Sequence, residues 1–321
     1  MKNFGITGVA GYIAPRHLQA IKDTGNNLVA AIDPHDSVGI LDRYFPNASF
    51  FTEFERFDRH LEKLRRTSEK GKIDYLTICS PNHLHDAHIR LALRLGANAI
   101  CEKPLVLNPW NLDALQELER DSGGKVYTIL QLRVHPSLIE LKNKLDNKNQ
   151  ASSSKHQVEL TYITSRGPWY KYSWKGDQNK SGGIATNIGI HFFDLLMWYF
   201  GGMERIEVHY SSADKMAGFI ELKKANVKWY LSLDRSDLPE EVLKNGKTTF
   251  RSIKVDDKEV EFTEGFTELH TKVYSETLEG RGFGIEIARP SVELVHKIRN
   301  EKVIDKPTTI HHFTKTILGI K

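Results

Sequence analysis

The stretch FGITGVAGYIA, residues 4–14, decides the fold of the N-terminal half. It reads as a short apolar strand that ends at Gly8, a glycine-rich turn and, from Pro15, a helix with apolar residues at helical spacing. A second apolar run, residues 28–32, ends in Asp33. Strand, glycine turn, helix, strand and acidic residue in this order predict a βαβ unit that binds a dinucleotide.

The chemistry of this unit favours NAD. The amino end of its helix offers backbone N–H groups to a pyrophosphate, and the Asp33 carboxylate accepts hydrogen bonds from ribose hydroxyls. A 2′-phosphate would meet a like charge at Asp33. The predicted cofactor contacts in this unit are Gly8, Gly11, Tyr12, Ile13, Ala14 and Asp33.

Two details of the unit qualify this prediction. The spacing Gly8, Gly11, Ala14 is not a strict GxGxxG, so a tight turn without a ligand stays an alternative. Arg16 and His17 follow on the helix, and we expect both on its surface.

Two further apolar runs, residues 73–80 and 98–101, are predicted parallel strands whose carboxyl ends line the same crevice. The predicted cofactor contacts there are Ser80, Pro81, Asn82, His85, Glu102 and Lys103. Glu102 either anchors Lys103 or satisfies backbone groups at the strand end. His83, His85 and His88 lie close in sequence, but only Asp86 adds a possible ligand, so we expect no metal.

The chain length of 321 residues predicts two domains. Strands and helices alternate up to about residue 125, which predicts a Rossmann-type doubly wound parallel sheet of α/β class over residues 1–125. One helix of this domain is expected over residues 49–66, with Phe51, Phe54 and Phe57 on its apolar side. Residues 126–321 are predicted to form a C-terminal α+β domain with an open, mainly antiparallel sheet. Its strands are expected at residues 158–164, 206–210, 219–222, 227–233 and 250–255, before a terminal helix at 290–300 with Val292, Leu294, Val295 and Ile298 on its apolar side.

Composition narrows the class of protein. The net charge of +4 is mild and does not indicate a nucleic-acid partner, and no apolar run is long enough for a membrane helix. The first residues enter a strand at once, so we expect no signal peptide. Cys79 and Cys101 lie in apolar runs without metal-ligand spacing, which favours reduced thiols and a cytoplasmic location.

Two segments of the second half carry candidate binding residues. Residues 166–176, which include Arg166 and Tyr170, interleave aromatic side chains with cations. Such a loop either stacks on a uracil and holds a diphosphate, or packs at a subunit interface. Residues 182–191 form a glycine-rich entry to an apolar helix, where Asp194 lies one turn after His191 and is placed to orient it.

Four motifs in this order resemble the Gfo/Idh/MocA oxidoreductases, named for glucose-fructose oxidoreductase and inositol dehydrogenase. They are the glycine turn with Asp33, SPNHLH at residues 80–85, CEKP at residues 101–104, and GG at 182–183 followed by NIGIHFFD at 187–194. The resemblance covers essentially the whole chain. It implies an NAD-dependent sugar dehydrogenase with an open sheet in the second domain.

A closer resemblance is to bacterial UDP-N-acetylglucosaminuronate 3-dehydrogenases of O-antigen synthesis. It rests on GVAGYIAPRH at residues 8–17, DSVG at 36–39, FERFDRH at 54–60 and LVLNPWN at 105–111. The resemblance implies that a UDP-sugar uronate is oxidised at carbon 3, for a diacetamido-uronic acid of lipopolysaccharide. It also implies a homotetramer and, in this subfamily, 2-oxoglutarate as acceptor of the hydride from bound NADH.

Removal of the hydroxyl proton needs a base, and Lys103 and His191 are the two candidates. A lysine desolvated near a cationic nicotinamide is expected to have a lowered pKa, which suits a base. Many family members carry an aspartate four residues before the motif histidine, whereas this chain has Asn187, which cannot stabilise an imidazolium by charge. We therefore expect Lys103 to be the base and His191 to position the hydroxyl. Arg133 and His135, after another strand end, either hold the sugar carboxylate or pack at a domain interface.

The predicted substrate contacts are Lys103, Arg133, His135, Arg166, Tyr170, Asn187 and His191. Two other functions stay open on the sequence. One is a dehydrogenase of a free sugar or inositol, against which the aromatic and basic loop argues mildly. The other is a dinucleotide-sensing regulator on the same fold, which need not keep both Lys103 and His191.

Overall fold

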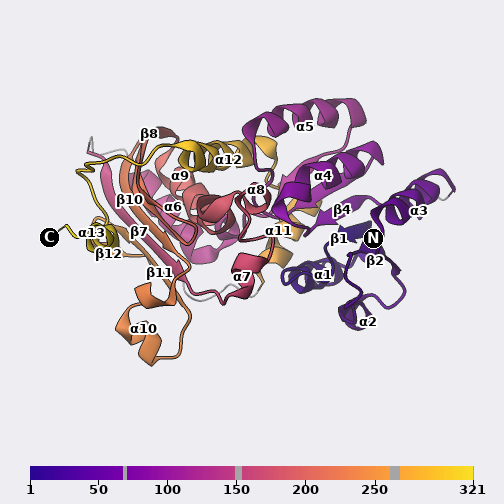
Figure 1. Ribbon diagram of the computed structural model, residues 1–321. Helices are drawn as coiled ribbons and strands as arrows, with labels where there is room; N and C mark the ends of the chain where they lie inside the picture. The colour runs from indigo at the N-terminus through magenta and orange to yellow at the C-terminus, as the bar shows by residue number, and fades with distance from the viewer. Residues whose placement is uncertain (68–70, 149–153, 261–267, 321) are drawn as a thin grey trace. The chain divides into compact units, whose positions relative to one another are not determined.

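The computed structural model describes residues 1–67, 71–148, 154–260 and 268–320. The chain forms two compact units (Figure 1). Unit 1 comprises Met1–His135 and Gly265–Arg289, and unit 2 comprises Pro136–Glu264 and Pro290–Lys321. Unit 1 is therefore completed by a segment that returns from far along the chain.

Unit 1 is built on sheet A, whose six strands are all parallel. In spatial order they are β3 (Ser49–Phe51), β2 (Asn27–Ile32), β1 (Asn3–Thr7), β4 (Tyr75–Ile78), β5 (Asn98–Cys101) and β6 (Val126–Thr128). This is the strand order of the Rossmann fold, and the predicted doubly wound parallel sheet is confirmed. The order reverses between β1 and β4, and in such sheets ligands bind beyond the carboxyl ends of the strands at that reversal.

The helices of unit 1 come from both of its chain segments. They are α1 (Ala14–Asp23), α2 (Ile40–Tyr44), α3 (Phe54–Thr67), α4 (His85–Arg94), α5 (Pro109–Ser122) and, from the returning segment, α11 (Leu269–Leu278). Helix α1 packs against α11, and α4 packs against α5. Val273 and Tyr274 of α11 belong to the same buried apolar cluster as Phe4 and Leu18. Helix α11 therefore completes the core of unit 1.

Two boundaries of unit 1 differ from the sequence prediction. The change of domain was expected between residues 125 and 126, but β6 is the sixth strand of sheet A and the unit runs to His135. Residues 49–51 were expected at the start of a helix, but they form edge strand β3, and the helix begins at Phe54. Residues 49–51 pair with β2 at the edge of the parallel sheet. The helical spacing of apolar residues does not reveal such a pairing.

Unit 2 contains sheet B, whose strands lie in the order β12, β11, β7, β10, β9, β8. Their bounds are β7 (His156–Thr164), β8 (Met203–Ser211), β9 (Lys215–Leu222), β10 (Ala225–Ser232), β11 (Thr249–Val255) and β12 (Lys258–Glu259). Strands β7 and β10 are parallel, and the other neighbouring pairs are antiparallel. The prediction of a mainly antiparallel second sheet is confirmed.

Helix α9 (Ile190–Phe200) covers part of sheet B and follows a π-helical turn, Ala185–Gly189. The ring centroid of Phe193 lies 5.4 Å from that of Trp229 on β10, and that of Phe192 lies 4.7 Å from that of Tyr162 on β7. Unit 2 also contains α6 (Pro136–Lys148), α7 (Trp169–Tyr172), α8 (Gln178–Ser181), α10 (Glu240–Lys244) and α13 (His312–Leu318). The π-turn matters for function because such turns often occur where a helix presents functional side chains.

Helix α12 (Ile285–Asn300) begins in unit 1 and continues in unit 2 from Pro290. The predicted helix was expected to start at Pro290, and the structure extends it toward the N-terminus as far as Ile285. The expected apolar side is confirmed, since Val292, Leu294, Val295 and Ile298 are all buried. Among the described residues, no helix is both long and apolar enough to cross a bilayer.

Candidate active site

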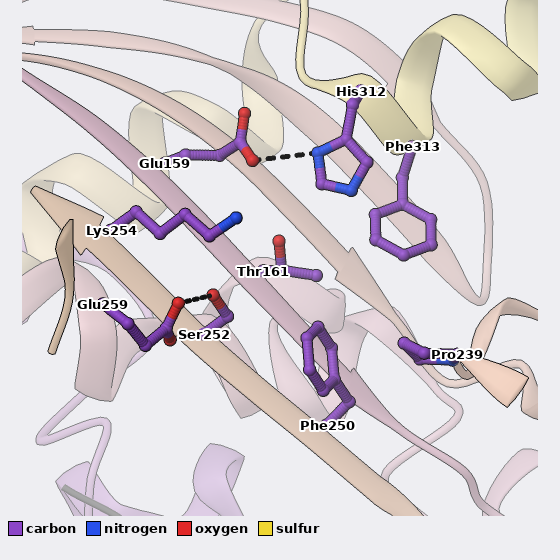
Figure 2. A pocket seen from close by; sticks show the side chains of 9 residues that line it. All are labelled: Glu159, Thr161, Pro239, Phe250, Ser252, Lys254, Glu259, His312 and Phe313. Atoms are coloured by element: carbon purple, nitrogen blue, oxygen red, sulfur yellow. Dashed lines mark hydrogen bonds and ion pairs between the residues drawn. The ribbon is translucent and has the colours of Figure 1, made fainter. Parts of the chain in front are cut away.

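A hollow of about 280 Å³ on β7 and β11 contains none of the predicted site residues (Figure 2). His312 Nδ1 in this hollow lies 2.9 Å from a carboxylate oxygen of Glu159. Together with His311 these residues bring three potential metal ligands close to one another. The two ring nitrogens of His311 are already bonded to Thr161 Oγ1 and to the backbone N–H of Phe313. The hollow is therefore a poor candidate for the predicted chemistry.

The glycine turn after β1 is shaped by close contact with the end of β4. Gly8 has φ +77°, and a Cβ built on it would lie 2.6 Å from the carbonyl carbon of Cys79. Its N–H donates to the carbonyl of Ile32 at 2.9 Å, and its carbonyl accepts from Gly11 N–H at 3.0 Å. Only glycine fits this backbone conformation and this approach. Tyr12, in the same turn, is 90% exposed.

The amino end of α1 and Asp33 complete a site that fits a dinucleotide. Helix α1 begins at Ala14, and the residue before it, Ile13, provides no side-chain cap for the first N–H groups. Asp33 is buried at the end of β2 and accepts from the backbone N–H groups of Ala10 at 3.0 Å and His35 at 2.9 Å. These bonds fix the carboxylate beside the glycine turn. The uncapped helix end suits a pyrophosphate, and the fixed carboxylate suits a ribose.

Two histidines, His85 and His88, hold the loop after β4 in place. The Ser80 hydroxyl lies 2.8 Å from Nδ1 of His88, and burial lowers the pKa of His88 to about 4. Asn82 is buried, and Pro81 is half-buried. His85 was predicted to contact the cofactor, but its side chain is completely buried. Its ring nitrogens lie 2.9 Å from the carbonyl oxygen of Ser80 and 2.7 Å from that of Pro104, so it joins this loop to the one after β5.

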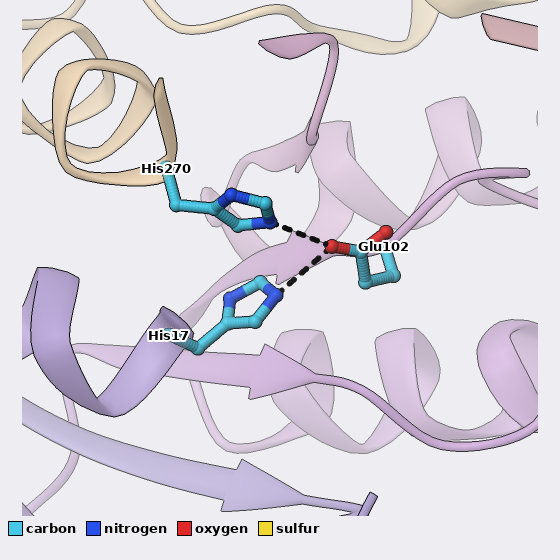
Figure 3. A group of neighbouring side chains, drawn as sticks. All are labelled: His17, Glu102 and His270. Carbon is cyan, nitrogen blue, oxygen red and sulfur yellow. Dashed lines mark hydrogen bonds and ion pairs between the residues drawn. The ribbon is translucent and has the colours of Figure 1, made fainter. Parts of the chain in front are cut away.

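Glu102, at the end of β5, lies at the centre of a buried polar cluster (Figure 3). Its Oε1 lies 3.0 Å from Nε2 of His17 and 3.1 Å from Nε2 of His270. Its Oε2 accepts from the backbone N–H of Lys103 at 3.2 Å. Glu102 was expected either to anchor Lys103 or to satisfy backbone groups at the strand end. The one hydrogen bond from the backbone N–H of Lys103 satisfies a strand-end backbone group and also contacts this lysine.

The cluster holds a charge. Burial alone would raise the pKa of Glu102, but the hydrogen bonds from His17 and His270 outweigh burial and hold that pKa well below its usual range. Burial likewise lowers the pKa of His17. The carboxylate is therefore ionised and the His17 ring is neutral near pH 7. A buried carboxylate with several donors is stable, whereas one without donors is costly.

The remaining predicted residues of unit 1 lie after neighbouring strands. Lys103 is half-buried directly after β5. Arg133 lies in a short helical turn, Gln131–Val134, which follows β6 and packs against α11. His135 follows this turn and is buried. Their predicted contacts with a substrate stay predictions.

In unit 2, the structure joins two predicted residues directly. Asn187 Nδ2 donates to the Tyr170 hydroxyl at 2.6 Å, and both side chains are buried. Burial raises the pKa of Tyr170, so its hydroxyl is neutral. His191, in the first turn of α9, is half-buried, and Asp194 is buried on the same helix. Asn187 lies within the π-turn that precedes this helix.

The aromatic and basic loop of unit 2 is largely exposed. Arg166 is exposed, Trp169 is 55% exposed and Tyr172 is 90% exposed. The ammonium of Lys175 lies 4.3 Å from the ring centroid of Trp174 and 5.8 Å from that of Trp169. These cation–π contacts order the loop within the unit. Stacking on a uracil and packing against another subunit both remain compatible with the exposed rings.

Two sequence profiles match the chain. One, described as "Oxidoreductase family, NAD-binding Rossmann fold" of the Gfo/Idh/MocA group, matches residues 2–129. The second, the C-terminal alpha/beta domain of the same family, matches residues 155–299. The chain belongs to the Gfo/Idh/MocA oxidoreductase family. Unit 1 is thus the NAD-binding domain of a family of oxidoreductases.

Among solved structures, the WlbA (WbpB) dehydrogenase from Thermus thermophilus is 52% identical, with a TM-score of 0.92 and coverage of 97% of this chain and 99% of that one. That structure contains NAD and alpha-ketoglutarate, and another of the same enzyme contains NAD and UDP-GlcNAcA at 51% identity, with a TM-score of 0.92 and coverage of 98% and 100%. The WlbA dehydrogenase from Bordetella pertussis has a TM-score of 0.74 at 17% identity over 95% of this chain and 98% of that one, which shows the shared fold alone.

Curated Gfo/Idh/MocA relatives are more distant. Oxidoreductase P35 from Formosa agariphila is 25% identical over 212 residues, which are 64% of this chain and 62% of the relative. The inositol 2-dehydrogenase of Rhizobium meliloti is 26% identical over 199 residues, which are 62% of this chain and 54% of the relative. The chain thus spans less than two thirds of the length of these curated relatives.

The buried cluster around Glu102 was not predicted from the sequence. His17 was expected on the surface of its helix, and this prediction was wrong because α11 covers that side of α1. His270 was not singled out, since it lies 168 residues from Glu102 in sequence. Arg16 is exposed, as expected. The sequence does not show that a histidine on a helix is buried until the segment that packs over that helix is known.

Proposed function

We propose that the protein oxidises the carbon-3 hydroxyl of UDP-N-acetyl-D-glucosaminuronic acid to a 3-keto sugar, with NAD as cofactor. The observation that carries the proposal is the 51% identity, over nearly the whole of both chains, to a dehydrogenase solved with NAD and UDP-GlcNAcA. The charged cluster around Glu102 also supports the proposal. Its carboxylate accepts from the backbone N–H of Lys103 and so holds this lysine at a strand end of an NAD-binding domain.

The local structure of unit 1 supports the proposed cofactor contacts. When bound, NAD supplies the hydride acceptor. The uncapped start of α1 holds the pyrophosphate through backbone N–H groups, and Gly8 keeps the turn close to β4. Asp33 accepts from the ribose hydroxyls and disfavours a cofactor with a 2′-phosphate.

Lys103 takes the hydroxyl proton, and His191 holds the hydroxyl in position. A lysine near a cationic nicotinamide is favoured as the neutral amine, which is the form that accepts a proton. His191 lacks the carboxylate that other members of the family place four residues earlier, and the amide of Asn187 donates to Tyr170 instead. Because an amide cannot stabilise an imidazolium by charge, we assign His191 the role of a hydrogen-bond donor to the hydroxyl.

The nucleotide and the uronate need cations. Arg166 is an exposed guanidinium suited to a diphosphate, and the rings of the same loop suit a uracil. Tyr170 and Asn187 bind the sugar as a bonded pair. Arg133 and His135 hold the sugar carboxylate.

The protein also uses 2-oxoglutarate to recover NAD from bound NADH. The structure of the Thermus thermophilus enzyme in complex with NAD and alpha-ketoglutarate supports this. The active form is a homotetramer in the cytoplasm, and the 3-keto product serves the synthesis of a lipopolysaccharide sugar.

The decisive experiment offers the protein with NAD to a panel of substrates and follows NADH fluorescence. The panel contains UDP-GlcNAcA, UDP-glucuronate, UDP-GlcNAc, free sugars and inositol. Each reaction is repeated with 2-oxoglutarate, because bound NADH that is not released would otherwise limit sugar oxidation to one turnover. In these reactions the oxidised sugar is the readout, since 2-oxoglutarate takes the hydride back from NADH. Mass spectrometry of the sugar then shows loss of two hydrogens. The proposal is overturned if a free polyol is oxidised rapidly while no nucleotide sugar is.

A further inference from the structure

Both chain neighbours of Lys103 are held by buried histidines. The carboxylate of Glu102, the residue before it, is bonded to His17 and His270. The carbonyl oxygen of Pro104, the residue after it, lies 2.7 Å from Nδ1 of His85. His17, His85 and His270 are no more than 3% exposed and lie on helices α1, α4 and α11. Three separate segments of unit 1 thus converge on the backbone around one lysine.

The direction of each bond around Glu102 follows from the charge of its carboxylate. An ionised carboxylate only accepts, so Nε2 of both His17 and His270 carries the proton and donates. His17 is neutral, so its Nδ1 accepts from the Tyr274 hydroxyl at 2.9 Å. The Tyr274 oxygen in turn accepts from the Thr77 hydroxyl at 2.8 Å. The chain of bonds therefore runs without a break from β4 to the carboxylate.

His85 fixes the other side of Lys103. The carbonyl oxygens of Ser80 and Pro104 face its two ring nitrogens at 2.9 Å and 2.7 Å. A carbonyl oxygen only accepts, so a neutral ring donates one of these bonds and a protonated ring donates both. In either form the ring lies between two loops that follow neighbouring strands of sheet A.

His17, Glu102 and His270 are arranged as a hydrogen-bonded cluster rather than as a metal site. Two histidines and a glutamate bring three possible ligand atoms together. The two Nε2 atoms, however, converge on the Glu102 oxygen itself at hydrogen-bond distance, as Figure 3 shows, rather than on a point between three ligands. Both Nε2 atoms donate to this oxygen, and the other carboxylate oxygen of Glu102 accepts from Lys103 N–H.

We propose that His17, His270 and His85 are positioning residues that fix Lys103 by holding the carboxylate before it and the carbonyl after it. The proposal rests on the proposed role of Lys103 as the base. None of the three histidines contacts a substrate in this account. Their effect is on the rate of proton removal, because a displacement of about 1 Å at a reacting group can lower a rate about 100-fold.

His270 gives the sharpest test, since its ring donates to Glu102 from the returning segment of the chain. His270→Leu removes the donor, whereas His270→Gln restores an N–H at a similar distance from the backbone. The matched control is His311→Leu, which removes a buried, hydrogen-bonded histidine in unit 2. All variants are studied as full chains with NAD, at a temperature where circular dichroism shows them folded.

We expect His270→Leu to lower kcat by about 10- to 100-fold with little change in KM or in NAD affinity. His270→Gln should recover most of kcat, and His311→Leu should keep it. A second measurement does not depend on the substrate: acetylation of Lys103 by acetic anhydride, mapped by peptide mass spectrometry in the NAD-bound protein. His270→Leu should change the rate at Lys103, while the rate at exposed Lys125 stays the same.

The two measurements separate the two proposals. If the wild-type protein oxidises no sugar of the panel, the proposed function fails, and the acetylation rates still decide whether the histidines position Lys103. Equal kcat loss in His270→Leu and His311→Leu would overturn the positioning role, as would an unchanged acetylation rate at Lys103. Stoichiometric zinc in the purified protein that is lost in His270→Leu would also overturn it, because the cluster would then be a metal site.

Discussion

Lys103 and His191 are embedded in opposite kinds of surroundings. The residue before Lys103 is a buried anion with donors from two helices that lie far apart in sequence. Asn187, in the π-turn before His191, forms a neutral pair with Tyr170, which lies only 17 residues away. The backbone next to Lys103 in unit 1 is therefore held by a charged group and by long-range contacts. Unit 2 presents its histidine from an apolar helix with a neutral hydrogen bond nearby.

This difference supports the proposal that Lys103, rather than His191, is the base. A base must lose and gain a proton readily, and it must be held where the proton is removed. Hydrogen bonds from His17 and His270 hold the Glu102 carboxylate in place, so little reorganisation is needed around Lys103. Asn187 offers His191 no charge to stabilise a proton. We therefore expect Lys103 to take the proton and His191 to position the hydroxyl.

The largest effect is expected for Lys103→Ala. Loss of the base should lower kcat by about 100- to 10,000-fold, the usual range for general base catalysis. NAD should still bind, because the glycine turn and Asp33 are unchanged, and quenching of intrinsic tryptophan fluorescence measures this. Lys125→Ala, an exposed lysine of the same unit, is the control. A kcat near wild type in Lys103→Ala would refute the assignment.

A smaller loss is expected for His191→Ala, which removes a positioning group and leaves the base in place. We expect kcat to fall by about 10- to 100-fold, as for loss of one oriented contact. His191→Gln, which keeps an N–H donor, should lose less, and His312→Ala serves as an exposed control. If His191→Ala is slower than Lys103→Ala by orders of magnitude, the roles of the two residues are reversed.

The sequence was sufficient for the parts of the site that depend on local order. The glycine turn, the acidic residue after β2 and the lysine after β5 follow from strands that end where the apolar runs end. The second sheet follows from alternating residues, with small errors at its ends. These features depend only on residues close in sequence, and local sequence patterns predict such features well.

The sequence was insufficient for contacts that depend on distant segments. His17 looked like a surface residue because α1 is amphipathic, and the covering helix comes from residues 269–278. His85 looked like a cofactor contact because it follows a strand end, but its ring is used inside the unit. The edge strand at residues 49–51 was assigned to a helix for a similar reason, since its partner β2 lies elsewhere in the chain.

The charged cluster of unit 1 also predicts a dependence of stability on pH. Burial lowers the pKa of His17 from 6.5 in the folded protein, so the unfolded chain binds an extra proton below that pH. Stability from this residue is therefore present above pH 6.5 and is lost as the pH falls below it, by up to about 1.4 kcal/mol per pH unit. Glu102, whose pKa is lowered, contributes in the same direction only below its own unfolded value of 4.5.

Urea unfolding of the wild-type protein between pH 7 and about pH 5 measures this slope, since that window lies below the unfolded pKa of histidine. His17→Gln should flatten the slope, because the variant has no proton to bind at this position. The slope is the readout, since the variant is also less stable at every pH. An unchanged slope in His17→Gln would mean that His17 is protonated in the folded protein.

The smallest effect is expected in unit 2, for Tyr170→Phe. The change removes the acceptor of the Asn187 amide and leaves a buried donor without its partner, which costs about 1 to 3 kcal/mol of unfolding free energy. Tyr172→Phe is the matched control in the same short helix, because that ring is 90% exposed. Asn187 can still bind the sugar, so KM should rise only by about 2- to 10-fold, the usual cost of one hydrogen bond. A loss of kcat as large as that of His191→Ala would instead show that the Tyr170 hydroxyl acts on the substrate, and the neutral pair of unit 2 would then share the chemistry assigned to Lys103.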